Sequence, residues 1–351
     1  MWTDGVLPSV HLRIRQTKSP PEGETRMPQT TTKRKGVSYA KYGYLFSLPF
    51  IIIFLIFMLY PTLFTAVIGF TDFKGVATTS YKFLEHPFDN FISILNNKTF
   101  RTSLVNTVVI WVMNFIPQIS LALLLTAWFT NRSRKIYGQG LFKVLFYLPN
   151  IITAATVAIL YAAIFGYPVG PVNDILQSLG LLSKPFDFTT SPWAAKLVVA
   201  FIQFWQWYGY TTIILISGVL GINPELFEAA EIDGASPRQT FFQITLPCMR
   251  TILVFTLITS LIGGLNMFDI PKLYIWNGGP ANTTMTTNVF IYAQAFSGSY
   301  LYNKAAAASM IMFVIIAILS GITFYLMRDR TEARAKRDMR RLEKLTKGAA
   351  V

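Results

Sequence analysis

Long apolar blocks separated by short polar segments run through most of the chain. Six of them are long enough to cross the ~30 Å hydrocarbon core of a bilayer, which takes ~20 helical residues. Their interiors hold no Asp, Glu, Lys or Arg, as expected of lipid-exposed segments. Backbone groups in lipid must pair within their own segment, so the pattern predicts an all-α polytopic membrane protein with six transmembrane helices. The blocks cover approximately residues 44–70, 103–130, 144–166, 197–221, 251–269 and 305–327.

Composition supports this prediction and narrows the chemistry. Hydrophobic residues make up 52% of the 351 positions and charged residues 14%, whereas a soluble domain carries about a quarter charged residues. The single cysteine, Cys248, excludes an intrachain disulfide and a thiolate metal cluster. The two histidines, His11 and His86, are far apart in the sequence, so we expect no histidine metal site. No G-x-x-x-x-G-K-[ST] phosphate loop occurs, so we expect any ATP hydrolysis to occur in another chain.

The net charge of +14 would suggest nucleic-acid binding in a soluble protein. Here the basic residues stand at the ends of apolar blocks, which indicates membrane orientation and contact with lipid, and we expect no nucleic-acid partner. With both termini in the cytoplasm, 23 of the 31 Lys and Arg residues lie on the inner side. This asymmetry favours six spans with both ends cytoplasmic.

Polar tails flank the predicted six-span permease domain, residues 42–327. Residues 1–41 lack the apolar core of a cleavable signal, and we interpret them as a disordered, basic cytoplasmic tail. Met27 is an alternative start to Met1, and the sequence leaves the choice open. Residues 328–351 form a basic cytoplasmic C-terminal tail. It is either a regulatory arm or a lipid-surface anchor worth ~1 kcal/mol per basic residue, and the anchor is the favoured interpretation.

Prolines and amides interrupt several of the apolar blocks. One interpretation is ordinary kinks whose polar groups pair with neighbouring helices, and the other is that some of these residues line a polar path. The sequence leaves both open. The interruptions are Pro49, Pro61, Asn114, Pro117, Gln118, Pro149, Asn150, Gln203 and Asn266.

A charged segment, residues 221–247, lies between the fourth and fifth predicted spans on the predicted cytoplasmic side. Asn223 is a natural N-cap, with Pro224 at the first helical position. Gly234 can adopt the left-handed conformation that ends a helix, and Ser236-Pro237 repeats the start signal. The segment therefore predicts cytoplasmic coupling helices, two short helices joined by a glycine turn.

Such a pair of helices forms a compact knob suited to contact with another protein. Ala229 and Ala230 have almost no side chain, so another surface can approach closely. The Glu228 carboxylate can accept a paired contact from a partner arginine. A knob of this kind can transmit a rigid-body movement from a soluble motor into the membrane spans.

This segment resembles the coupling signature of permease subunits in binding-protein-dependent ABC importers. The matching residues are Glu228, Ala229, Ala230, Gly234, Ile244, Leu246 and Pro247. Further motifs resemble the carbohydrate branch of that family, the maltose and glycerol-phosphate permease type. They are Leu148-Pro149, Gly170-Pro-Val-Asn173, Trp207-Tyr-Gly209-Tyr210, Phe268-Asp269 and Asn277-Gly-Gly-Pro280. The resemblance covers most of residues 40–327, but residues 268–278 are one residue longer than the family pattern, which leaves the register at the outer end of span five open.

The resemblance implies a multi-pass protein of the bacterial cytoplasmic membrane, with partners that the sequence itself does not show. These are a second permease subunit that forms a hetero-dimer with this chain, two ATPase subunits and an extracytoplasmic solute-binding protein. ATP and Mg would bind the ATPase subunits, and no cofactor is expected in this chain. The implied function is import of a mono- or oligosaccharide, with glycerol phosphate or another small solute as the alternative.

By likeness to maltose permeases, the solute path would draw on spans three, four and five. Aromatic faces cover the apolar faces of a sugar ring, and amides and hydroxyls bond its hydroxyl groups. Tryptophans at such positions also serve in interfacial belts or helix packing. The candidate path residues are Asn150, Thr153, Trp205, Tyr208, Gly209, Thr212 and Asn266.

Two other classes of protein fit less well. An ion-coupled secondary transporter normally needs a carboxylate or histidine within a span, and the interiors of the six blocks have neither. A membrane scaffold without transport function does not account for the 221–247 segment. The sequence does not identify the solute.

Overall fold

The structure is a computed structural model that describes residues 40–75, 80–132, 136–275, 278–298 and 300–327, together with residue 339. The described residues are helical or irregular and include no β-strand, apart from an isolated bridge between Thr71 and Phe83. The predicted all-α fold is therefore confirmed for this part of the chain. The predicted tails lie outside the described residues, except at positions 40, 41 and 339.

The described helices fit a polytopic membrane protein. Four are long and apolar enough to cross a membrane, and the number rises to six if each of two bent helix pairs is one span. The four are Lys41–Ile68, Lys98–Phe129, Arg250–Tyr274 and Tyr302–Met327. The bent pairs are Gln139–Ile151 with Ala154–Ile164, and Pro192–Leu220 with Pro224–Ile232.

The chain divides into two compact units at residue 55. In the first unit, α1 (Ala40–Phe54) exposes apolar side chains on all sides. Phe50 and Phe54 stack along it with ring centroids 6.3 Å apart. Such a surface is stable only in an apolar solvent, which agrees with the prediction of a membrane span here.

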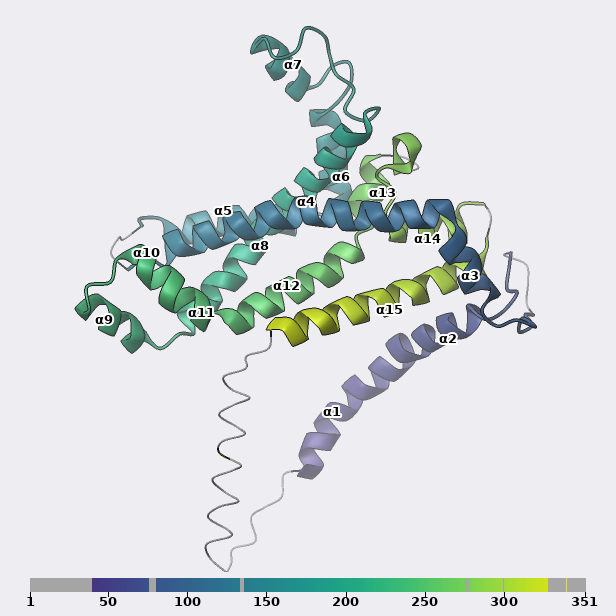
Figure 1. Cartoon of the computed structure of the whole chain (residues 1–351), viewed down its shortest axis with the longest axis horizontal. Coiled ribbons are helices and arrows are strands. Elements are labelled where there is room, and N and C mark those ends of the chain that lie inside the picture. Colours follow the sequence, from purple (N-terminus) through teal and green to yellow (C-terminus); the bar gives the residue numbers. More distant parts are fainter. Residues whose placement is uncertain are drawn as a thin grey trace, which may run out of the picture. The chain divides into compact units, whose positions relative to one another are not determined.

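The second unit is built around α4 (Lys98–Phe129), which packs along α8 (Pro192–Leu220), α12 (Arg250–Leu265) and α14 (Thr287–Phe296) (Figure 1). α15 (Tyr302–Met327) lies against α12 and α14, and also against α2 (Tyr60–Ile68) and α3 (Asp89–Asn96). α9 (Pro224–Ile232), α10 (Pro237–Gln239) and α11 (Leu246–Cys248) gather near the C-terminal end of α4, whereas α3 lies at its N-terminal end. α7 (Pro171–Ser178) stands apart in the segment between α6 (Ala154–Ile164) and α8.

The third predicted span differs from expectation because it is broken. α5 (Gln139–Ile151) and α6 (Ala154–Ile164) are bent by 93°. At ~1.5 Å per residue, each is too short to cross ~30 Å of hydrocarbon alone. Pro149 removes one helical donor, and Ile152 and Thr153 are extended, with ψ of 134° and 144°. The Thr153 hydroxyl then accepts from the Thr156 N–H at 3.3 Å and starts α6.

Gly209 allows α8 to approach α5 very closely. It is buried on α8 and faces the backbone of Phe146 and Tyr147, and a Cβ at this position would overlap the Phe146 carbonyl group. The neighbouring Tyr208 ring lies 6.0 Å from the Phe146 ring, centroid to centroid. The α5–α8 contact therefore depends on a position without a side chain.

We expect Gly209→Ala to destabilise the protein, because the added methyl forces α5 and α8 apart. Overpacking of this kind costs about 1–3 kcal/mol, which exceeds the helix-propensity gain of about 1 kcal/mol for Ala over Gly. The matched control is Gly321→Ala on α15, where a Cβ meets nothing within 4 Å. Thermal unfolding in detergent should show a lower midpoint for Gly209→Ala only. Equal midpoints for the two variants would contradict the close contact.

Candidate functional site

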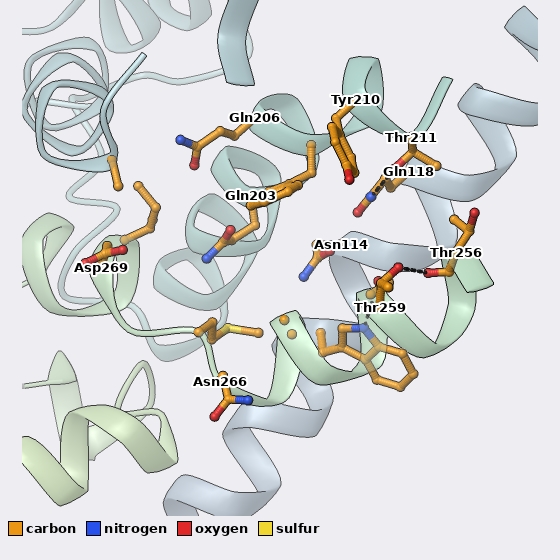
Figure 2. Close-up of a pocket in the computed structure, with 18 of the residues that line it drawn as sticks. Asn114, Gln118, Gln203, Gln206, Tyr210, Thr211, Thr256, Thr259, Asn266 and Asp269 are labelled. Atoms are coloured by element: carbon orange, nitrogen blue, oxygen red, sulfur yellow. Dashed lines mark hydrogen bonds between the residues drawn. The ribbon is translucent and has the colours of Figure 1, made fainter. Parts of the chain in front are cut away.

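A cavity of about 450 Å³ opens between α4, α8 and α12 (Figure 2). This volume lies in the range of small-molecule sites, about 300–1,000 Å³. Gly263 and the turn from Asn266 to Asp269 complete the wall where α12 ends. Most of the wall is polar or aromatic: Trp111, Asn114, Gln118, Gln203, Gln206, Trp207, Tyr210, Thr211, Phe255, Thr256, Thr259 and Ser260.

Helical periodicity explains which side chains reach the cavity. Residues three and four apart lie on one face of a helix. On α4 this spacing joins Trp111, Asn114 and Gln118. The cavity side chains of α8 form a similar stripe: Gln203, Gln206, Trp207, Tyr210 and Thr211.

Hydrogen bonds tie the walls of the cavity together. Gln118 Nε2 donates to Thr211 Oγ1 at 2.7 Å, and both side chains are buried, so this bond joins α4 to α8. Gln206 Nε2 donates to the Ile152 carbonyl at 3.3 Å, which joins α8 to the break between α5 and α6. Trp111 Nε1 donates to Ser260 Oγ at 3.3 Å and joins α4 to α12. These bonds fix the relative positions of the lining side chains.

The remaining polar groups and rings face the cavity, which is partly open. Asn114 and Gln203 point into it from α4 and α8 (Figure 2). Within the described residues, the Gln203 amide makes no hydrogen bond, so both its donor and its acceptor are available. Trp207 and Tyr210 meet edge to face with centroids 5.6 Å apart. Asp269, which is exposed, is the only charged residue among those that line the cavity.

Of the seven candidate path residues, Asn266 lines this cavity. Its Nδ2 donates to the Ile262 carbonyl at 2.9 Å, so its Oδ1 stays available. Two other candidates lie at the break between α5 and α6. Thr153 caps α6, and Asn150 Nδ2 approaches the Gln206 carbonyl at 3.4 Å.

The other four candidates are on the neighbouring face of α8, outside this cavity. Trp205 packs edge-on against Tyr161, with centroids 5.4 Å apart, as the packing interpretation of this tryptophan expects. Tyr208 contacts the Phe146 ring, and Gly209 contacts the backbone of α5. Thr212 is buried and donates to the carbonyl of Tyr208 at 2.8 Å.

Sequence analysis alone did not single out Gln206, Tyr210, Thr211, Thr256 or Thr259 for the cavity. The signal that was informative is an amide within an apolar block. Asn114, Gln118, Gln203 and Asn266, all noted as interruptions, line the cavity. Gln118 also pairs with Thr211 on the neighbouring helix α8, so both interpretations of these interruptions stay open.

The segment between α8 and α12 folds as its local chemistry predicts. The Asn223 side chain accepts from the Glu225 N–H at 3.1 Å and caps α9. Gly234 has φ of +73°, and its N–H bonds the Glu231 carbonyl at 3.1 Å while the Ala235 N–H bonds the Ala230 carbonyl at 2.9 Å. These two bonds form a Schellman motif, which closes α9.

The second short helix begins with a complete capping box. The Ser236 side chain accepts from the Gln239 N–H, and the Gln239 side chain accepts from the Ser236 N–H at 2.8 Å. The predicted pair of helices and the left-handed glycine between them are confirmed. Beyond α10 the chain continues as a π-helix, Thr240–Thr245, into α11.

α9 presents one face outward and the other to its own chain. The Glu228 side chain is 65% exposed and Ile232 is 86% exposed, and Ala229 is exposed beside them. Ala230, by contrast, is buried, so its small size serves packing within the chain. Arg132, after α4, lies 4.0 Å from Glu228, measured from Nη1 to Oε1, and connects α9 to the span.

The other residues of the coupling signature follow α9. Ile244 lies in the π-helix and is half-buried. Leu246, the first residue of α11, is also half-buried, whereas Pro247 is exposed. Asn277, quoted for the resemblance, lies outside the described residues.

Comparison with known proteins shows the family. Residues 90–337, more than half of the chain, match the family described as binding-protein-dependent transport system inner membrane component. The chain therefore belongs to this family. It is a multi-pass membrane component of a transport system and not an enzyme.

Particular relatives are permeases named for sugars. The lactose transport system permease protein LacF of Rhizobium radiobacter is 32% identical over 303 residues, which cover 86% of this chain and 99% of LacF. The arabinooligosaccharides transport system permease protein AraP of Bacillus subtilis (strain 168) is 29% identical over 292 residues, 81% of this chain and 87% of AraP. These relatives confirm the resemblance to the carbohydrate branch of ABC importer permeases.

A solved structure has a similar fold. It is a bacterial alginate ABC transporter in complex with alginate pentasaccharide-bound periplasmic protein. One of its chains is 25% identical to this chain, with a TM-score of 0.69, and the match covers 82% of this chain and 94% of that one.

Proposed function

We propose that this chain conducts a sugar across the membrane, as one permease subunit of a binding-protein-dependent importer driven by ATP. The observation that carries the proposal is the cavity between α4, α8 and α12. It combines the Gln203 amide, which makes no hydrogen bond among the described residues, with the rings of Trp207 and Tyr210, and it lies among helices long enough to span a bilayer. Amides bond sugar hydroxyls, and aromatic faces cover the apolar faces of the ring.

A neutral mono- or oligosaccharide suits this cavity better than glycerol phosphate. Among the described residues that line it there is no Lys or Arg, and the charged one, Asp269, would repel a phosphate group. The relatives are named for lactose and arabinooligosaccharides, and these names support a sugar as the solute.

The proposal includes six spans with both termini in the cytoplasm. The spans would be α1–α2, α4, the bent pair α5–α6, α8, α12 with the short helix Asp269–Tyr274, and α15. α9 carries Glu225, Glu228 and Glu231, and this charge excludes it from hydrocarbon, so α8 would cross alone. α9 would then lie at the cytoplasmic surface, with residues 1–41 and 328–351 as tails of a domain at 42–327.

The proposed partners follow from the family and from the exposed knob. A second, similar permease subunit would complete the path as a hetero-dimer, and an extracytoplasmic binding protein would deliver the sugar. Two ATPase subunits would bind ATP and Mg, with no cofactor in this chain. The outer face of α9, with Glu228, Ala229 and Ile232 exposed, would dock on one ATPase subunit. Gly234, Ile244, Leu246 and Pro247 would hold the knob in shape behind that face.

Filling the cavity should block transport without unfolding the protein. A Cβ at Gly263 meets nothing within 4 Å, so Gly263→Trp places an indole in the open space of the cavity. We expect loss of sugar uptake by the assembled complex, with normal amounts of subunit in the membrane. The matched control is Gly321→Trp, at an equally open position on α15. Wild-type uptake by Gly263→Trp would contradict the proposed path.

Damage to the knob should separate ATP hydrolysis from transport. Gly234→Val puts a β-branched residue at φ of +73°, whereas Gly234→Asn tolerates that conformation and serves as the control. Glu228→Ala removes the exposed carboxylate from the docking face, and the loss of a charge pair at an interface weakens association at least about tenfold. We expect normal membrane abundance for all three variants. ATPase retention and uptake should fall for Gly234→Val and Glu228→Ala only, and full uptake by both would contradict the coupling role.

A further inference from the structure

Three consecutive residues at the start of α14 each form a hydrogen bond to an element of the cavity wall. Thr286 Oγ1 donates to the Met267 carbonyl at 2.9 Å. Asn288 Nδ2 donates to the Asn266 carbonyl at 2.8 Å. Between them, Thr287 Oγ1 lies 3.0 Å from Thr107 Oγ1 on α4. The Thr107 Oγ1 also accepts from the Thr287 N–H at 2.9 Å.

These three residues at the start of α14 are connected to α4 through Thr107. Thr107 lies one helical turn before Trp111, which lines the cavity. Thr107, Thr286 and Thr287 have no exposed surface, so the bonds of these three threonines are shielded from competition by solvent, whereas the bond from Asn288 to Asn266 is exposed. Asn106 adds a bond from Nδ2 to the Asn282 carbonyl at 2.7 Å. The segment 282–288 is thus fixed to the helix that forms one wall.

The groups held by Thr286 and Asn288 are the backbone carbonyls that follow α12. α12 ends at Leu265, and Asn266 has φ of −98° and ψ of 10°. Carbonyls at a helix C-terminus have no partner within the helix, so they must find one elsewhere. Thr286 and Asn288 supply it to two successive carbonyls, those of Met267 and Asn266.

Both of these backbone positions carry side chains that line the cavity. The Asn266 amide donates back to Ile262, which leaves its Oδ1 as an acceptor. The place of that oxygen depends on the Asn266 backbone, and the backbone is held by Asn288. A change at Asn288 therefore alters the cavity without touching a solute.

We propose that Thr286 and Asn288 are positioning residues for the solute cavity: they clamp the end of α12 to α4 and so fix Asn266 against the sugar. The proposal rests on the proposed function, because Asn266 must contact the sugar for its position to matter. Thr286 and Asn288 are outside the cavity lining and act through the backbone of residues 266 and 267.

The clamp itself is tested without any sugar, by hydrogen exchange in the assembled complex. Thr286→Val keeps the shape of the side chain and removes its hydroxyl, Asn288→Leu removes the amide, and Thr286→Ser keeps the donor. We expect faster exchange in residues 262–270 for Thr286→Val and Asn288→Leu, and wild-type exchange for Thr286→Ser. Thr323→Val is the matched control, since among the described residues the Thr323 hydroxyl bonds only the Leu319 carbonyl of its own helix, at 2.8 Å. Unchanged exchange in both test variants would overturn the clamp.

The positioning role is tested by a double-mutant cycle on uptake. The probes are lactose, an arabinooligosaccharide and diacetylchitobiose, and the sugar that the wild-type complex imports fastest is used. Asn288→Leu should lower uptake per membrane subunit about threefold to tenfold, the effect of losing one hydrogen bond. In an Asn266→Ala background the same change should have no further effect, because the side chain that it positions is gone.

The outcomes separate the clamp from the function. Equal fold-losses in both backgrounds would show a structural role only and overturn the positioning proposal. If Asn266→Ala leaves uptake unchanged while Asn288→Leu lowers it, the proposal is overturned as well. If the wild-type complex imports none of the three sugars, the proposed sugar specificity fails, and the exchange experiment still decides whether the clamp exists.

Discussion

Hydrocarbon offers no hydrogen bonds, so a polar side chain within a membrane span must find a partner in the protein or face an enclosed polar space. Three hydrogen bonds between helices satisfy this constraint. Gln118 bonds Thr211, Trp111 bonds Ser260, and the α4 hydroxyl of Thr107 bonds α14. These hydrogen bonds join α4 to α8, α12 and α14. Amides that make no such bond among the described residues, such as Gln203, point into the cavity that these helices leave open. The cavity is thus a consequence of how the spans satisfy their polar groups.

The parts of the molecule that sequence predicts best are those whose causes are local. Asn223, Gly234 and Ser236 each act on backbone groups within a few residues, so the α9–α10 pair could be predicted in detail. The spans were predicted from composition, because a run of apolar residues needs no knowledge of its neighbours. The break between α5 and α6 was not predicted, because Pro149 in a membrane helix is compatible with either a kink or a complete bend.

The face of α8 that lines the cavity was not predicted either. Successive side chains along a helix point in directions about 100° apart. Adjacent faces of α8 carry similar residue types, so their composition does not tell them apart. Trp205 and Tyr208 pack within the protein, whereas Trp207 and Tyr210 line the cavity. Hydrophobicity does not distinguish these faces, since lipid-facing and buried positions in a span are both apolar. The packing role of Gly209 could not be predicted from local sequence, because it depends on contact with α5, a helix distant in sequence.

In the proposed function, the cavity between α4, α8 and α12 holds the sugar during transport. The most direct measurement introduces a cysteine at Thr259, which lines the cavity, after replacing the exposed Cys248 with serine. Maleimide labelling of the assembled complex is then followed with its binding protein, with and without the imported sugar. Since a bound solute covers most of such a site, sugar should slow labelling several-fold at position 259 and leave a cysteine at position 321 unaffected. Equal labelling rates at position 259 with and without sugar would contradict a sugar site in this cavity.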